Sequence, residues 1–110
     1  MHSIRLPFAN VNRTSGRRQA EVEALGKTIN AERAAAGLSL EALGERAGGI
    51  HRNTMVDYEK GRKEVPFGKL VDIAEALGMS TLDLLKLAEE RGERDAHNSG
   101  ARGTRDDASA

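Results

Sequence analysis

Residues 47–63 read AGGIHRNTMVDYEKGRK, a glycine pair followed by a polar segment that a further glycine ends. At about 100° of rotation per residue, a helix over residues 52–60 turns Met55, Tyr58 and Glu59 to one side. The other side carries small and polar side chains, with one cation at the helix start: Asn53, Val56, Asp57, Lys60 and Arg52. The stretch therefore predicts a short helix that is buried on one side and open to a partner on the other.

The segments around this stretch also have helical periodicity interrupted by glycine. Apolar residues recur at three- and four-residue spacing before residue 37, between residues 39 and 47, and after residue 66. Ser39 and Ser80 are suited to cap helices, and glycines suited to end them stand at 37, 48, 49, 61 and 78. No segment alternates apolar and polar residues as a half-buried strand does. The chain is therefore predicted to be all-α, with five helices forming a compact domain over residues 20–91.

The segments outside this domain lack such periodicity. Residues 1–19 carry four arginines, no acidic residue, Pro7 and Gly16, and are expected to form a flexible basic N-terminal arm. Residues 92–110 contain no large apolar residue and are expected to form a disordered tail. The chain has 17 basic and 17 acidic residues, but residues 70–90 are acidic, so the neutral total conceals a polarised molecule.

Composition excludes several classes of protein. The chain has no cysteine, so it has no disulfide framework and no thiolate metal site. His2, His51 and His97 lack the spacing of metal ligands, and no cofactor is expected. The absence of an apolar leader or of a run of about 20 apolar residues predicts a cytoplasmic protein without a membrane partner. No nucleophile, base and orienting group occur together, so an enzyme is not expected, and the short chain leaves no room for a domain that binds a small-molecule ligand.

The second and third predicted helices have the order of a helix-turn-helix, in which a small residue stands where two backbones approach. Gly44 occupies that position, and a glycine inside a helix costs about 1 kcal/mol relative to alanine. Close contact with the third helix is the expected compensation.

The open side of the third helix has the chemistry of a major-groove reader. Arginine recognises guanine, asparagine recognises adenine, aspartate accepts from cytosine N4, and valine can touch a thymine methyl group. The residues predicted to contact bases are Arg52, Asn53, Val56 and Asp57. Phosphate contacts are expected from the start of the second helix, from the third helix and from the segment after it. These residues are Ser39, Leu40, Thr54, Lys60, Arg62, Lys63 and Lys69.

The order of these residues resembles the phage repressor and Cro type of helix-turn-helix, the xenobiotic-response-element family. The resemblance rests on LGKTINAERAAAGLSLEALGERAG (25–48), HRNTMVDYEKG (51–61) and LVDIAEALGMSTLDLL (70–85). It implies that the third helix is the recognition helix and that Arg33 and Glu59 form a structural ion pair. The inward position of Glu59 agrees with this, because a buried carboxylate requires a partner.

Two positions depart from the family pattern. Leu40 stands where the family usually has a glutamine that bonds a phosphate, so only the backbone amides of that helix start remain for this contact. Gly48 and Gly49 stand where one glycine is usual, which would shift the register of the third helix by about one residue.

These observations predict a sequence-specific double-stranded DNA-binding transcriptional regulator, a repressor of prokaryotic or phage type. A homodimer on a two-fold-related site is expected, since a single small module makes few base contacts; the fifth helix, to Arg91, is the expected dimer surface. Arg17 and Arg18 have two interpretations, a DNA-contacting arm or an inert leader. The alternative function is a protein-interaction module, such as an antitoxin or antirepressor, that works through the acidic residues 70–90.

Overall fold

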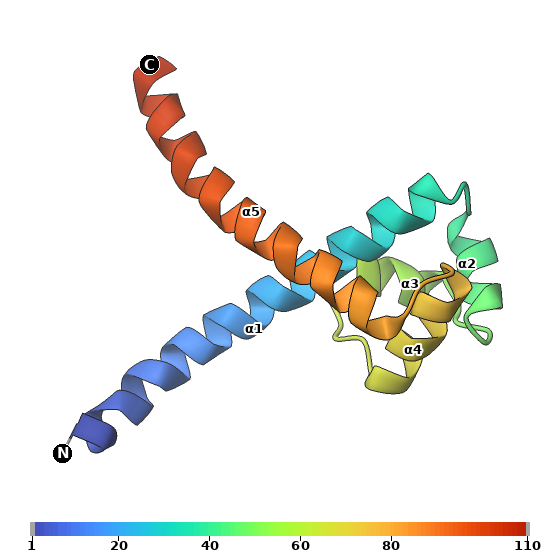
Figure 1. Ribbon diagram of the computed structural model, residues 1–110, viewed down its shortest axis with the longest axis horizontal. Helices are drawn as coiled ribbons and strands as arrows, with labels where there is room; N and C mark the ends of the chain where they lie inside the picture. Colours follow the sequence, from blue (N-terminus) through green and yellow to red (C-terminus); the bar gives the residue numbers. More distant parts are fainter. Residues whose placement is uncertain (1, 110) are drawn as a thin grey trace.

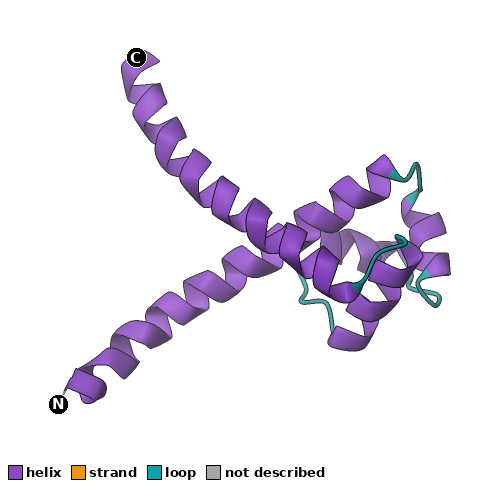
Figure 2. Cartoon of the chain, in the orientation of Figure 1, coloured by secondary structure: helices purple, strands orange, loops and turns teal. Residues whose placement is uncertain are grey.

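The computed structural model describes the backbone of residues 2–109 and the side chains of residues 16–97. The described chain contains five helices and no strand, with only turns and loops between them (Figure 2). The helices are α1 (His2–Ala35), α2 (Leu40–Arg46), α3 (Arg52–Glu59), α4 (Phe67–Ala76) and α5 (Thr81–Ser109). This confirms the prediction of an all-α fold with five helices and a helix-turn-helix at α2 and α3.

Helix α3 packs against α1, α4 packs against α5, and α2 packs against both α3 and α4 (Figure 1). Each of the five helices contributes at least one large side chain with no exposed surface: Ile29, Leu43, Met55, Ile73 and Leu84. These residues belong to one aliphatic core, which also contains Tyr58 from α3. Since every helix gives up apolar surface to the same core, their relative positions are fixed by packing.

Helices α1 and α5 cross at one side of this core and then diverge (Figure 1). The backbone is helical from His2 and as far as Ser109. The flexible basic arm over residues 1–19 and the disordered tail over residues 92–110 stay predictions. Met1 and Ala110 lie outside the described residues.

Side-chain contacts account for part of this extension. In α1, Arg17 pairs with Glu21 at 3.1 Å and Gln19 donates to Glu23 at 2.9 Å, both with the four-residue spacing that supports a helix. In α5, Gly92 lies in the helix where it faces Ala24 of α1. A Cβ at this position would lie 3.4 Å from the Cβ of Ala24, so the two helices lie close together here.

The helix boundaries follow local signals. The Ser39 hydroxyl accepts from the amide of Ala42 at 3.0 Å, and the Ser80 hydroxyl accepts from the amide of Asp83 at 3.0 Å. Both serines therefore satisfy backbone donors that a helix start leaves unpaired. Pro66, which has no amide hydrogen, precedes α4.

Two glycines bring backbones together around α3. A Cβ at Gly44 would overlap the carbonyl oxygen of Ile50, in the turn between α2 and α3, and would contact the Met55 side chain at 3.4 Å. The compensation for Gly44 thus comes mainly from the turn rather than from α3 itself, which corrects the sequence expectation. A Cβ at Gly26 of α1 would overlap the carbonyl oxygens of Tyr58 and Glu59. Both ends of α3 are consequently held by close backbone packing.

Candidate nucleic-acid interface

Helix α3 separates buried from open side chains. Met55 is fully buried, Tyr58 is 5 % exposed and Glu59 is 9 % exposed. Arg52 and Asn53 at the start of α3 are exposed, as are Lys60 at its C-cap and residues 62–64 of the following loop. The half-buried residues of the helix are Thr54, Val56 and Asp57. The open surface of α3 therefore runs from its N-terminus to the loop after its C-terminus.

The turn before α3 contains the glycine pair. Gly48 and Gly49 both have φ of +90°, a region that other residues rarely adopt. The amides of Gly49 and Ile50 both donate to the carbonyl of Gly44, at 2.9 and 2.8 Å. The glycine pair thus lies in a tight, hydrogen-bonded turn, and the buried Ile50 joins the core just before α3 begins.

His51 caps the N-terminus of α3. Its Nδ1 accepts from the amide of Asn53 at 3.1 Å, so the imidazole does what a serine or asparagine cap does elsewhere. The cap places Arg52 and Asn53 at the first turn of α3, which is where recognition helices contact base edges.

The C-terminal end of α3 is anchored to α1 through Glu59. Arg33 Nε donates to Glu59 Oε2 at 2.7 Å, and Asn30 Nδ2 donates to Glu59 Oε1 at 2.8 Å. Arg33 Nη1 also donates to the carbonyl of Leu38 at 2.9 Å. The hydrogen bond to Glu59, aided by its charge, raises the pKa of Arg33 above its ordinary value although burial acts in the opposite direction. The two side chains that the resemblance pairs are therefore brought together.

The residues predicted to contact bases differ in their surroundings. Asn53 is exposed, and Arg52 Nε lies 2.9 Å from Glu41 Oε2 of α2. Asp57 lies between two cations, with Arg62 Nη1 at 3.6 Å and Lys63 Nζ at 3.5 Å. The sequence predicts Asp57 as an open acceptor for a base, whereas two cations of the following loop lie beside its carboxylate.

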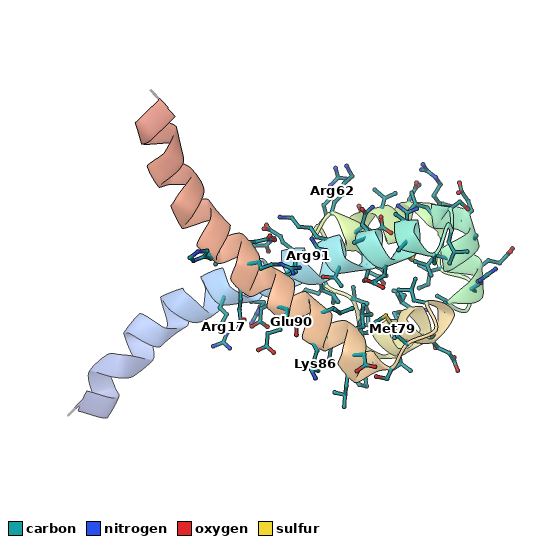
Figure 3. All side chains as sticks on the ribbon, turned by 45° about the horizontal axis from the view of Figure 1, so that its top comes forward. Arg17, Arg62, Met79, Lys86, Glu90 and Arg91 are labelled. Carbon is teal, nitrogen blue, oxygen red and sulfur yellow. The ribbon has the colours of Figure 1, made fainter. Side chains whose placement is uncertain are left out.

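Of the seven residues predicted to contact phosphate, Thr54 is half-buried in α3 and the other six divide into two sets. The cations at the end of α3 and beyond it are exposed, and Arg62 projects away from the helices (Figure 3): Lys60, Arg62, Lys63 and Lys69. At the start of α2, the Ser39 hydroxyl is engaged as a helix cap, and the Leu40 side chain packs against the core. Only the backbone of α2 is thus suited to hold a phosphate at that end.

The structure places Arg17 and Arg18 beside α5 and the loop after α3. Both line a groove between α1 and α5, together with Leu82, Leu85 and Lys86. Arg17 and Lys86 project to one side of the molecule and Arg62 to the other (Figure 3). In the part of the chain that the structure describes, no helix has the length and apolar character needed to cross a membrane.

Comparison with known proteins assigns the chain to a family. The helix-turn-helix domain family matches residues 24–87, which include α2, α3, α4 and the adjoining parts of α1 and α5. No curated protein matches the chain.

Three solved structures are similar to the chain. One crystal structure of the clp gene regulator ClgR from Corynebacterium glutamicum is 32 % identical with a TM-score of 0.66, covering 74 % of this chain and 87 % of that chain. A second ClgR structure is 34 % identical with a TM-score of 0.60, covering 64 % and 90 %. The restriction-modification controller protein C.AhdI from Aeromonas hydrophila is 28 % identical with a TM-score of 0.57, covering 59 % and 97 %. With α2 and α3 joined by a glycine turn and most of the chain matched, this protein belongs to the helix-turn-helix domain family.

Proposed function

We propose that the protein is a sequence-specific double-stranded DNA-binding transcriptional regulator of the phage repressor and Cro type, acting as a repressor in the cytoplasm. The observation that carries the proposal is the division of α3, which buries Met55 and Tyr58 but leaves Arg52, Asn53 and Lys60 exposed. An exposed helix about 10–12 Å wide fits the major groove, which is about 12 Å wide. The proposal assigns no catalytic activity to the chain.

The proposed contacts follow from which side chains are exposed. Arg52 and Asn53, at the first turn of α3, carry the donors that recognise guanine and adenine, and Val56 offers a methyl contact. Lys60, Lys69 and the loop cations Arg62 and Lys63 are exposed and are suited to phosphate. Occupation of a promoter by this surface would block transcription.

The similar proteins support regulation as the role. ClgR is described as a gene regulator and C.AhdI as a controller protein of a restriction-modification system. The family match over residues 24–87 includes α2 and α3, which supports α3 as the element of this chain that contacts DNA.

A homodimer is part of the proposal, because two half-sites supply the contacts that one module lacks. Ala88 of α5 is buried within the chain, but Leu82 is 73 % exposed and Leu85 is 36 % exposed, so the apolar surface for a second copy lies near the start of α5.

Leu82→Glu should yield monomers in light scattering. Phe67→Glu, at a similarly exposed position of α4, is the matched control and should leave the dimer intact.

Selection from random duplexes tests the function. A regulator should enrich one sequence with two-fold symmetry, and its affinity should fall with salt, with a log–log slope of about 0.9 per neutralised phosphate. A protein-interaction module would enrich no sequence, and its binding to DNA would be weak and independent of sequence.

A further inference from the structure

The end of α3 has a backbone geometry that brings residues 57 and 62 together. The amide of Gly61 donates to the carbonyl of Tyr58 at 3.2 Å, and the amide of Arg62 donates to the carbonyl of Asp57 at 2.9 Å. Gly61 has φ of +71°, so these two bonds form a Schellman motif. In Schellman motifs, the two side chains at the positions that residues 57 and 62 occupy here commonly make an apolar contact. Here both side chains are charged.

The Asp57 carboxylate uses both oxygens within this turn. Oδ1 lies 3.6 Å from Arg62 Nη1, and Oδ2 lies 3.5 Å from Lys63 Nζ. The Asp57 side chain is only 25 % exposed, whereas those of Arg62 and Lys63 are 63 % and 60 % exposed. The acid is therefore held at the base of the turn, and the two cations extend from it into solvent with most of their N–H donors free.

The turn itself is held against α1. A Cβ at Gly61 would lie 2.9 Å from Cγ and 3.2 Å from Cα of Glu23, so only a glycine fits there. Gln19 Nε2 donates to the carbonyl of Gly61 at 3.4 Å. Because the backbone below the two cations is fixed, the remaining freedom of Arg62 and Lys63 lies in their side chains.

We propose that Asp57 is a positioning residue for DNA binding, which holds Arg62 and Lys63 in orientations suited to adjacent phosphates and does not read a base. The inference rests on the proposed function and revises the base contact expected for Asp57. A cytosine amino group would have to compete with a cation for either oxygen. Long cationic side chains lose rotamer freedom when they bind, and prior restriction by Asp57 reduces that loss.

Asp57→Asn separates these roles when it is compared with Glu64→Gln. Glu64 is exposed in the same loop, and its substitution removes one negative charge without altering the turn. Glu64→Gln should strengthen binding to every duplex slightly, because a repulsive charge is lost. Asp57→Asn should weaken binding to every duplex by about five- to twentyfold, reduce the salt slope and leave the base preference unchanged.

Two further variants separate positioning from folding. Asp57→Glu keeps the carboxylate and should recover most of the affinity and the salt slope. In the background of Arg62→Ala with Lys63→Ala, Asp57→Asn should cause no further loss of affinity, because nothing remains to be positioned. Thermal unfolding of each variant shows that the comparison is made between folded proteins.

Three outcomes overturn the inference. A changed base preference at one site position, with the salt slope unchanged, would make Asp57 a base reader. If Asp57→Asn strengthens binding as much as Glu64→Gln does, Asp57 acts only as a repulsive charge. If Asp57→Asn weakens binding further in the Arg62→Ala, Lys63→Ala background, its effect does not depend on these two cations. If the unsubstituted protein enriches no duplex, the proposed DNA-binding function fails, and this inference fails with it. The other three outcomes leave the DNA-binding function intact and overturn only the inference.

Discussion

Arg33 of α1 donates from Nε to Glu59 Oε2 of α3 over 2.7 Å, with the two side chains only 17 % and 6 % exposed. This pair joins the first helix to the last turn of the recognition helix. Asn30 supplies a second hydrogen bond to the same carboxylate. The orientation of α3 is thus determined partly by a polar contact beneath the surface that would meet DNA.

Arg33→Ala should lower the free energy of unfolding by about 2–4 kcal/mol, because it leaves the Glu59 carboxylate buried with one partner fewer. Chemical denaturation measures this loss. Replacement of both residues, Arg33→Met with Glu59→Leu, is the control and should cost much less, since no charge remains buried. Equal losses in the single and double variants would show that packing, rather than the ion pair, matters at this position.

The contribution of Arg33 should not depend on pH between neutral and moderately alkaline solution. Its pKa is raised in the folded state, so the stabilisation is fully present below the ordinary arginine pKa and is lost only above the raised value. The difference in unfolding free energy between the unsubstituted protein and Arg33→Ala should therefore be constant across that range. A difference that shrinks at alkaline pH would contradict this prediction.

Gly44→Ala should destabilise the fold by about 1–3 kcal/mol, because the new methyl group would overlap the Ile50 carbonyl and force α2 and the turn apart. DNA affinity should fall further than the loss of folded protein explains, since the start of α3 moves. Gly68→Ala in α4 is the matched control. No atom lies within 4 Å of the added methyl group there, so stability should rise by about 0.5–1 kcal/mol.

His51→Ala should cost about 1 kcal/mol, because it removes the acceptor for the amide of Asn53. His51→Asn, which supplies another favourable cap, should retain the stability of the unsubstituted protein. Denaturant midpoints of the three proteins, at equal m values, measure the effect. Equal stability of the alanine and asparagine variants would mean that the cap does not stabilise α3.

Arg52→Ala should relax the preference at one position of the selected sequence and cost about 1–3 kcal/mol, whereas Lys63→Ala should weaken all duplexes about equally. Glu41→Gln should strengthen binding a few-fold, since it frees Arg52 from an exposed ion pair whose own contribution is about 0–1 kcal/mol. Competition titrations with specific and random duplexes measure all three. A uniform loss with Arg52→Ala would assign that residue to phosphate.

The helix boundaries between residues 37 and 80 could be predicted from the sequence because they depend on local signals. Ser39, Ser80 and the glycines at 37, 61 and 78 act on the few residues around them, and the apolar spacing identifies which side of each helix is buried. The buried side of α3, with Met55 and Tyr58, follows from the same spacing.

The contacts that sequence reasoning missed depend on how distant segments meet. Glu41 reaches Arg52 across the glycine turn, and Asp57 reaches Arg62 and Lys63 only because the chain reverses at Gly61. For Glu41 and Asp57, the partner could not be predicted from the sequence because it is determined by the tertiary arrangement.

In α3, the residues that stabilise the fold are different from the exposed residues proposed to contact DNA. Met55, Tyr58 and Glu59 hold the helix in place, and Asn53 and Arg52 contribute nothing to the core. Substitutions at residues 52 and 53 can therefore accumulate without loss of the native state. New operator preferences could therefore arise by mutation or by library selection at a few exposed residues of α3, while the core that holds the helix stays unchanged.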